Sequence, residues 1–388
     1  MKNKYSVILA LCFFVSLVFL GANQNHQWKG TISEVDGVMV VNNPSEPLKG
    51  KIELDLVEIM RIDPIKYKDI DLVNFSKIFN DKNGNIYLFD ADEIKAFQFD
   101  KYGNFLGSFI REGQGPGEFS DGFFVSLHFI KNEIWAVDPR KISRFDKYRN
   151  FISDIKFRKG YLFSRIVDEN HFIGEHQAAE GEGNELQQNN IISLIQIPDE
   201  NKEKILYDYL KAKDIGMIRQ GNSAFADRWA TPRIKWLFDR ERQKVYTSIN
   251  TKYEITVMEL NGKVNLIFNR EFQKAKPTLQ EKKNHIDKIF KSRDWILKAY
   301  PNELCAIYEM RLLPKGFLAV FSIKGIESLS IDIFDENGKF QYVIEAPDDI
   351  SLIDAIYTDR GVSTIKVEED RNIYIEYRIS NLPEIFGH

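Results

Sequence analysis

One short unit of apolar strands and tight turns recurs along this chain, and its last copy is incomplete. Four copies are well preserved and one is degenerate; they begin at Ile86, Ile134, Val245, Phe317 and, for the degenerate copy, Phe172. The last copy, Asp370–Ser380, stops after its first half. Strand-forming repeats of about 40 to 75 residues are typical of a β-propeller, in which each repeat forms one radial sheet. Five copies with an outer half and one without it predict six blades.

The missing outer strands of the last blade have to come from elsewhere in the chain, because an open ring would expose unpaired strand edges. Two N-terminal stretches have the pattern of strands. Lys29–Pro44 reads as a hairpin with Asp36-Gly37 at its turn, and Lys51–Ile62 alternates apolar and charged residues. One or both should pair with the last blade. The prediction is an all-β fold: a six-bladed β-propeller closed by its N-terminal segment, with one inserted helix.

The domain organisation follows from the same pattern. We expect a signal peptide over residues 1–22, a lead segment with the hairpin over 23–50, and one propeller over 51–388. Residues 278–300 interrupt the propeller with apolar side chains at helical spacing, and Pro301 ends that pattern. This helix either packs on the rim of the ring or serves as a lid or docking element. The polar stretch Glu175–Asn190 is expected to be a surface loop.

The first residues have the composition of an export signal. Lys2 and Lys4 precede the apolar run Val7–Leu20, which is shorter than the roughly 20 residues of a membrane-spanning helix. Cleavage after Ala22 would place the mature chain in the periplasm or outside the cell, with no membrane span left. An uncleaved anchor is the alternative. A lipoprotein anchored through Cys12 is a further alternative, although the residue before Cys12 is too large for lipoprotein processing.

Composition excludes some classes of partner and chemistry. The net charge is −4 over 388 residues, so no nucleic-acid partner is expected. The mature chain keeps one cysteine, Cys305, which rules out an intramolecular disulfide. Its six histidines show no metal-ligand spacing, and there is neither a nucleophile elbow nor a cofactor fingerprint. We therefore expect no metal and no cofactor, and the sequence identifies no catalytic residue.

A glycine-rich segment links the chain to a known family. Arg111–Phe119 reads REGQGPGEF and follows an FDKYGNFLGSF hairpin. Together with WKGTISEVDGVMVVNNP near the N-terminus, it resembles the secreted bacterial six-bladed β-propellers of the NHL-repeat-like type, over most of the chain from Trp28. The resemblance implies the propeller fold and an extracytoplasmic location. It implies no activity, because most members of that family have none assigned.

The same segment is a candidate ligand loop. Gly113, Gly115 and Gly117 give its backbone freedom, and Arg111 and Glu118 flank them with charge. Glycine-rich loops bind phosphate when a helix begins directly after them, and no helix is expected here. Two interpretations remain: a structural crossover between blades, and a loop that contacts a ligand.

A basic residue or histidine followed by an apolar residue recurs on the strand expected to be innermost in each blade. These residues are Lys77, His128, Arg165, Lys235, Arg311 and Lys366. Because side chains alternate between the two faces of a strand, all six are expected to border the central channel. A ring of like charges has to be offset. Either acids such as Asp90 and Asp138 pair with it, or it binds an anionic ligand, to which arginine offers bidentate contacts.

Three functions are compatible with the sequence. The first is a non-catalytic extracytoplasmic propeller that binds an anionic small molecule, a carbohydrate or a partner at the mouth of its channel. The second is a propeller hydrolase or lyase acting on an anionic carbohydrate or lactone. The third is a scaffold for protein partners that uses its loops and inserted helix. Anion-dependent stabilisation would favour the first, and a divalent metal in the channel would favour the second.

Overall fold

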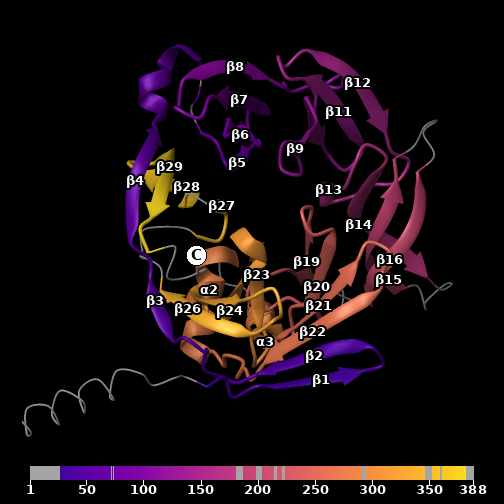
Figure 1. The fold of residues 1–388 in the computed structure, drawn as a ribbon, viewed down its shortest axis with the longest axis vertical. Helices are drawn as coiled ribbons and strands as arrows, with labels where there is room; N and C mark the ends of the chain where they lie inside the picture. Colours follow the sequence, from indigo (N-terminus) through magenta and orange to yellow (C-terminus); the bar gives the residue numbers. More distant parts are fainter. Residues whose placement is uncertain are drawn as a thin grey trace, which may run out of the picture.

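Six sheets stand around a central axis, and each forms one blade of a β-propeller (Figure 1). The structure is a computed structural model and describes residues 27–381 apart from 71, 73, 181–186, 198–202, 214–215, 221–222, 291–293, 346–351 and 359–360. The predicted signal peptide and its cleavage position after Ala22 lie outside the described residues. The six-bladed propeller predicted from the repeats is confirmed.

Blades 1 to 3 follow one another in chain order, and each is a four-stranded antiparallel sheet whose first strand is innermost. Blade 1 consists of β5 (Lys77–Asn80), β6 (Ile86–Asp90), β7 (Lys95–Phe99) and β8 (Phe105–Phe109). Blade 2 consists of β9 (Ser126–Ile130), β10 (Glu133–Val137), β11 (Lys141–Asp146) and β12 (Phe151–Lys156). Blade 3 consists of β13 (Ser164–Ile166), β14 (His171–Glu180), β15 (Gln187–Gln196) and β16 (Lys204–Lys213).

Blades 4 and 5 carry extra strands from the N-terminal segment. Blade 4 consists of β19 (Ile234–Asp239), β20 (Lys244–Ile249), β21 (Glu254–Glu259) and β22 (Val264–Arg270). The hairpin of β1 (Thr31–Val35) and β2 (Val38–Asn43) extends it, with β2 parallel to β22. Blade 5 consists of β23 (Ile307–Leu312), β24 (Leu318–Gly325), β25 (Ser328–Phe334) and β26 (Phe340–Glu345), to which β3 (Lys51–Glu53) adds in parallel. The hairpin, a candidate for the last blade, therefore belongs to blade 4.

Blade 6 closes the ring with strands from both ends of the chain. Three strands come from the tail: β27 (Ile356–Thr358), β28 (Gly361–Glu368) and β29 (Arg371–Ile379). The fourth, β4 (Leu56–Ile62), pairs antiparallel with β29, and Ile62 faces Tyr374 in the register. The predicted closure by the N-terminal segment is confirmed, but it supplies one strand and not two. The 3-10 helix η1 (Pro64–Ile70) then leads into blade 1.

The turns between strands follow the predicted chemistry. In four hairpins an aspartate accepts hydrogen bonds from the backbone N–H groups two and four residues later; these are Asp81, Asp100, Asp146 and Asp335. The residue three positions after each aspartate has a positive φ. Glycine holds that place in three turns, as Gly103 does with φ 84°, and Arg149 holds it in the other with φ 75°.

The core is divided into clusters of buried apolar side chains, one at each interface between neighbouring blades. The cluster between blades 6 and 1 includes Ile62 of β4, Phe97 of β7 and Tyr374 of β29, none of which is exposed. Closure of the ring is therefore a core contact as well as a strand pairing. Such interfaces hold the inner strands in place around the axis.

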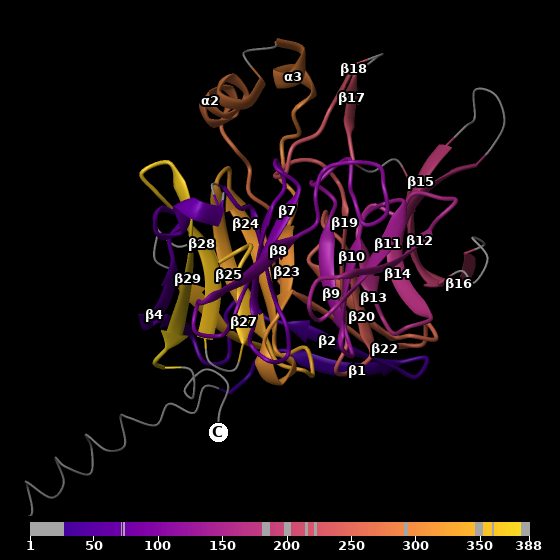
Figure 2. The ribbon, with the colours of Figure 1, turned by 90° about the horizontal axis from the view of Figure 1, so that it is seen from above.

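The insertion after β22 forms two helices where one was expected: α2 (Leu279–Phe290) and α3 (Asp294–Ala299). They lie with the hairpin of β17 (Ile218–Gln220) and β18 (Ser223–Phe225) on the face where the chain crosses between blades (Figure 2). A buried cluster that includes Ile286 and Tyr300 packs beneath them.

The helix α2 has a defined start and a buried anchor. Thr278 and Glu281 form a capping box, in which the Glu281 N–H donates to Thr278 Oγ1 over 3.2 Å and the Thr278 N–H donates to Glu281 Oε2 over 2.7 Å. His285 Nε2 lies 2.7 Å from Asp227 Oδ2, and both side chains are 1% exposed. Ile286 shares its buried cluster with Ile323 of β24, so the insertion packs on blade 5.

The polar stretch predicted to be a loop is structured at both of its ends, so that prediction is wrong there. β14 reaches Glu180 and β15 begins at Gln187, and residues 181–186 lie outside the described residues. His176 and Asn189 are buried in this hairpin, and His176 Nε2 lies 2.9 Å from Ser193 Oγ. The polar composition concealed strands because part of these side chains hydrogen-bond within the sheet.

Candidate functional site

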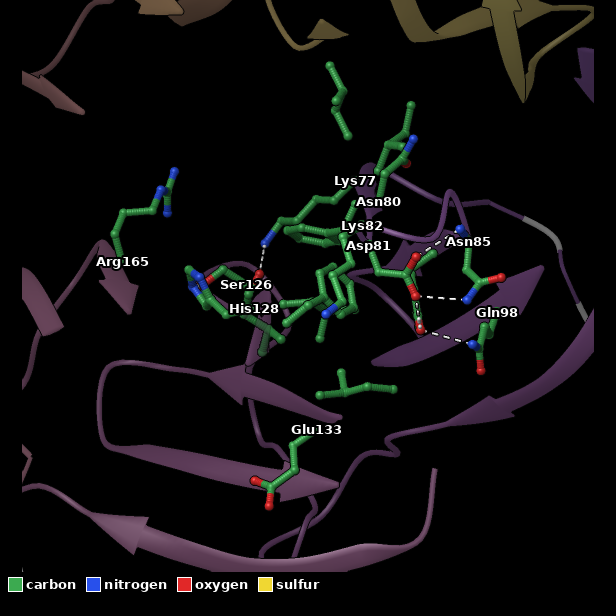
Figure 3. Close-up of a pocket in the computed structure, with 18 of the residues that line it drawn as sticks. Lys77, Asn80, Asp81, Lys82, Asn85, Gln98, Ser126, His128, Glu133 and Arg165 are labelled. Atoms are coloured by element: carbon green, nitrogen blue, oxygen red, sulfur yellow. Dashed lines mark hydrogen bonds between the residues drawn. The ribbon is translucent and has the colours of Figure 1, made fainter. Parts of the chain in front are cut away.

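A cavity of about 1250 Å³ lies at the axis and extends between blades 1 and 2. Its wall includes residues of the innermost strands β5, β9, β13, β23 and β27. Of the six residues predicted to form a basic ring, four line this cavity: Lys77, His128, Arg165 and Arg311. Figure 3 shows Arg165 across the cavity from Lys77 and His128.

Lys77 is held by backbone carbonyls of the segment that connects β8 to β9. Its ammonium donates to the carbonyl oxygens of Gly122 over 3.0 Å, Phe123, and Val125 over 2.9 Å. Desolvation lowers the pKa of Lys77 to about 8, with Asp121 acting against it and Arg165 adding to it. Lys77 therefore fixes the wall of the cavity and carries a charge that is lost in mildly alkaline solution.

His128 contributes no positive charge to the cavity. Burial, Arg165 and Arg240 hold the pKa of its imidazole well below the usual range, so the ring is neutral at pH 7. Its Nε2 lies 3.1 Å from Ser126 Oγ. The predicted ring of six charges is thus interrupted at blade 2.

Arg165 is different because no carboxylate neutralises it. Its Nη1 donates to the carbonyl oxygen of Ser164 over 3.0 Å, and it forms no ion pair in the part of the chain that the structure describes. Desolvation and the nearby Arg311 lower the pKa of Arg165, and Glu309 acts in the opposite direction. A guanidinium remains charged despite such a shift.

Glu309 neutralises the predicted ring residues of blades 4 and 5, Lys235 and Arg311. Its carboxylate lies 3.4 Å from Lys235 Nζ and 3.4 Å from Arg311 Nη1. Desolvation acts to raise the pKa of Glu309, but Lys235 and Arg311 outweigh it, and the pKa is lowered. Arg311 Nη2 also lies 3.5 Å from Asp354 Oδ1. Lys235 is not part of the cavity wall.

Two sequence-based assignments around the ring are wrong. Lys366 lies on β28, the second strand of blade 6, and not on the innermost strand β27; its Nζ is 3.8 Å from Glu368 Oε1. The acids proposed as partners serve turns. Asp90 accepts backbone N–H groups after β6, and Asp138 accepts those of Arg140 and Lys141 after β10.

Sequence reasoning missed two residues that shape this site. Glu309 stands two positions before Arg311 on the same strand, and that spacing places the two side chains on one face. The pairing of Glu309 with Arg311 is therefore predictable from the sequence. Arg240 follows β19 and donates to the carbonyls of Phe129, over 3.1 Å, and Ile166. No local pattern indicates that a turn residue of blade 4 reaches blades 2 and 3.

The cavity wall has an excess of positive charge. Among its described residues, eight are lysine or arginine and three are aspartate or glutamate. Lys77, Arg165 and Arg240 are the lining cations that bond to backbone carbonyls and form no ion pair in the described ranges. The chain as a whole carries a net charge of −4, so the wall of this cavity differs in sign from the rest of the chain.

The glycine-rich segment satisfies its own hydrogen bonds. Arg111 Nε donates to Glu118 Oε1 over 2.7 Å, and the Gly115 N–H donates to Glu118 Oε2 over 2.8 Å. A Cβ on Gly113 would lie 2.1 Å from Glu118 Oε2, and both Gly113 and Gly117 have positive φ. None of these residues lines the cavity. The Glu118 carboxylate thus occupies the place that an anion would take in a ligand loop.

Neither a metal cluster nor a membrane-spanning helix is present in the described residues. No group of three or more histidine, cysteine, aspartate or glutamate side chains there is arranged to hold a metal ion. No helix in the described ranges is both long and apolar enough to cross a bilayer.

Two solved structures are similar to this one over most of its length. A member of the DUF4221 family from Bacteroides vulgatus is 9% identical, covers 84% of this chain and 98% of its own, and has a TM-score of 0.53. A "Putative exported protein" from Bacteroides fragilis is 13% identical, covers 88% of this chain and 99% of its own, and has a TM-score of 0.52. No protein-family model and no curated protein sequence matches the chain. At these identities the similarity shows the fold alone.

Proposed function

We propose that this chain is a non-catalytic extracytoplasmic propeller that binds a small anionic ligand in its axial cavity, with Arg165 as the main contact. The observation that carries the proposal is a guanidinium in the cavity wall with no carboxylate partner among the described residues. Arginine binds carboxylate or phosphate through two parallel hydrogen bonds. The excess of lining cations raises the local concentration of anions.

The extracytoplasmic location rests on the N-terminal pattern of Lys2, Lys4 and the apolar run Val7–Leu20, with cleavage after Ala22. The resemblance to the NHL-repeat-like secreted propellers supports the same location. The description of the Bacteroides fragilis neighbour agrees with it. At this location, an anion in the periplasm or in the medium would reach the cavity without crossing a further membrane.

Thermal unfolding of the chain from residue 23 should report this binding. A ligand at about a hundredfold its Kd stabilises the folded state by about 2.7 kcal/mol and raises Tm by several degrees. Arg165→Ala should remove a charge-assisted bidentate contact worth about 1.5–3 kcal/mol, which weakens Kd by roughly 10- to 100-fold. The measurement is Tm against anion concentration at low salt, where attraction is least screened.

Arg158→Ala is the matched control, because Arg158 is exposed and lies outside the cavity wall. It removes one positive charge and should leave the anion-dependent rise in Tm unchanged. A flat response of the unmodified chain to citrate, phosphate and sugar acids would contradict the proposal. So would an equal loss of response in the two variants.

Anion binding should also weaken as the pH rises from 7 to 9. The pKa of Lys77 is lowered to about 8, so its charge is present below this pH and lost above it. Loss of the positive charge of Lys77 should weaken the free energy of anion binding by roughly 1 kcal/mol, which is about a fivefold rise in Kd. The Lys77→Met variant should bind the anion with a Kd that does not rise between pH 7 and 9. The Lys82→Met variant, which also lacks a lining cation, should keep this pH dependence. Isothermal titration calorimetry across the pH range measures this, and a pH-independent Kd in the unmodified chain would refute the assignment.

A further inference from the structure

Three phenylalanine side chains form a cluster in the cavity wall. Phe123 and Phe124 belong to the segment before β9, and Phe163 directly precedes β13. The ring centroids of Phe123 and Phe124 are 4.9 Å apart, and those of Phe124 and Phe163 are 5.9 Å apart. Phe123 is 64% exposed and Phe163 is 47% exposed. Phenylalanine is usually buried, and an exposed aromatic cluster beside a cavity is typical of a ligand-contacting surface.

The cluster is held rigidly beside the charges. Lys77 donates to the carbonyl oxygens of Gly122, Phe123 and Val125, and its Nζ lies 5.9 Å from the centroid of the Phe123 ring. The Phe123 N–H donates to Asp121 Oδ1 over 2.7 Å. Phe163 stands two residues before Arg165 in the chain. A flat apolar surface and an unpaired guanidinium are therefore presented to one cavity by fixed backbone segments.

The rest of the wall favours a hydroxylated ligand over a purely apolar one. Ser126, Asn80 and Ser164 line the cavity, so its wall combines hydroxyl and amide residues with the cations. Amides and hydroxyls match the alternating donors and acceptors of a sugar, whereas a fatty chain would leave them unpaired.

We propose that the ligand is an acidic sugar, free or at the end of a saccharide chain. Its carboxylate or sulfate pairs with Arg165, and the apolar face of its pyranose ring rests on the rings of Phe123 and Phe163. This inference rests on the proposed function and names the class of anion that the cavity selects. Neither the charge nor the aromatic surface alone selects this class, because a small anion uses only Arg165 and a neutral sugar uses only the phenylalanines.

Calorimetry at pH 7 and low salt tests the assignment with matched probes. D-glucuronate and D-gluconate carry the same carboxylate, but only glucuronate has a ring. The unmodified chain should bind glucuronate about tenfold more tightly than gluconate or acetate. Phe123→Ala and Phe163→Ala should each weaken glucuronate binding about fivefold and leave gluconate binding unchanged. Arg165→Ala should weaken both. Tetragalacturonate is included as a saccharide chain. Tighter binding of tetragalacturonate than of glucuronate indicates a chain end as the ligand, and tighter binding of glucuronate indicates a free sugar acid.

Tyr102→Ala is the control, since Tyr102 is an aromatic side chain that is 73% exposed and lies outside the cavity wall. It should not change any of these affinities. Equal binding of glucuronate and gluconate, or phenylalanine variants that leave their ratio unchanged, would overturn the sugar assignment while the anion site stands. Tighter binding of benzoate than of glucuronate would also overturn it. Binding of no anion, with no effect of Arg165→Ala, would remove both the function and this inference.

Discussion

Replacing Ile62 with aspartate is expected to destabilise the propeller by more than about 4 kcal/mol and to leave most of the chain insoluble. Ile62 is not exposed, ends β4, and packs between blades 6 and 1. A carboxylate there would lie within this apolar cluster, opposite Tyr374 in the strand register. Loss of β4 would also uncover the edge of β29, which then becomes free to pair with other chains. Solubility and urea unfolding followed by circular dichroism measure the effect.

Val57→Asp is the matched control on the same strand, because Val57 is 39% exposed. It should change the free energy of unfolding by less than about 1 kcal/mol. Ile62→Ala keeps the test quantitative if the aspartate variant cannot be purified, with an expected loss of about 2–5 kcal/mol. Equal stability of the Ile62 and Val57 variants would contradict closure of the ring through β4.

Replacing Arg270 with methionine should cost about 3–5 kcal/mol, because it leaves a buried carboxylate without its cation. Arg270 Nη1 lies 3.4 Å from Asp332 Oδ2, and the two side chains are 4% and 0% exposed. The guanidinium also lies over three aromatic rings, among them Phe340 at 4.8 Å. Asp332 additionally accepts hydrogen bonds from Tyr253, over 2.7 Å, and Ser330, over 3.0 Å. Urea unfolding at pH 7 measures the loss.

The double variant Arg270→Met with Asp332→Asn should recover a large part of that stability. The asparagine removes the unpaired charge, and its oxygen can still accept from Tyr253. Lys51→Met breaks an ion pair between exposed side chains, Lys51 and Glu345, and should leave the free energy of unfolding nearly unchanged. If Arg270→Met behaved like Lys51→Met, the buried pair would have no special role in joining blades 4 and 5.

The candidate site was only partly predictable, because strand alternation determines which residues face the cavity, whereas contacts between blades determine which of them are neutralised. Four of the six residues of the expected ring, the cations Lys77, Arg165 and Arg311 and the neutral His128, line the cavity, since alternation along an inner strand fixes which residues face the axis. The prediction for Lys366 is wrong because inner and second strands have the same apolar pattern. β27 is only three residues long and gives a weak periodic signal, so the sequence favours β28 as the innermost strand. The turn after β28 uses Glu369 and Asp370 at positive φ, which lacks the glycine that marks other turns.

The amino-acid sequence by itself determined the number of blades, the turns and the closure of the ring. These features depend on short-range periodicity and on residues that tolerate a positive φ, such as those after Asp100 and Asp335, and both are written locally in the chain. Only the tertiary structure decided which cations are neutralised. Glu309 pairs with Lys235 of the preceding blade, and Arg165 pairs with none of the described carboxylates, because Coulomb interactions depend on distances between blades that no local pattern encodes.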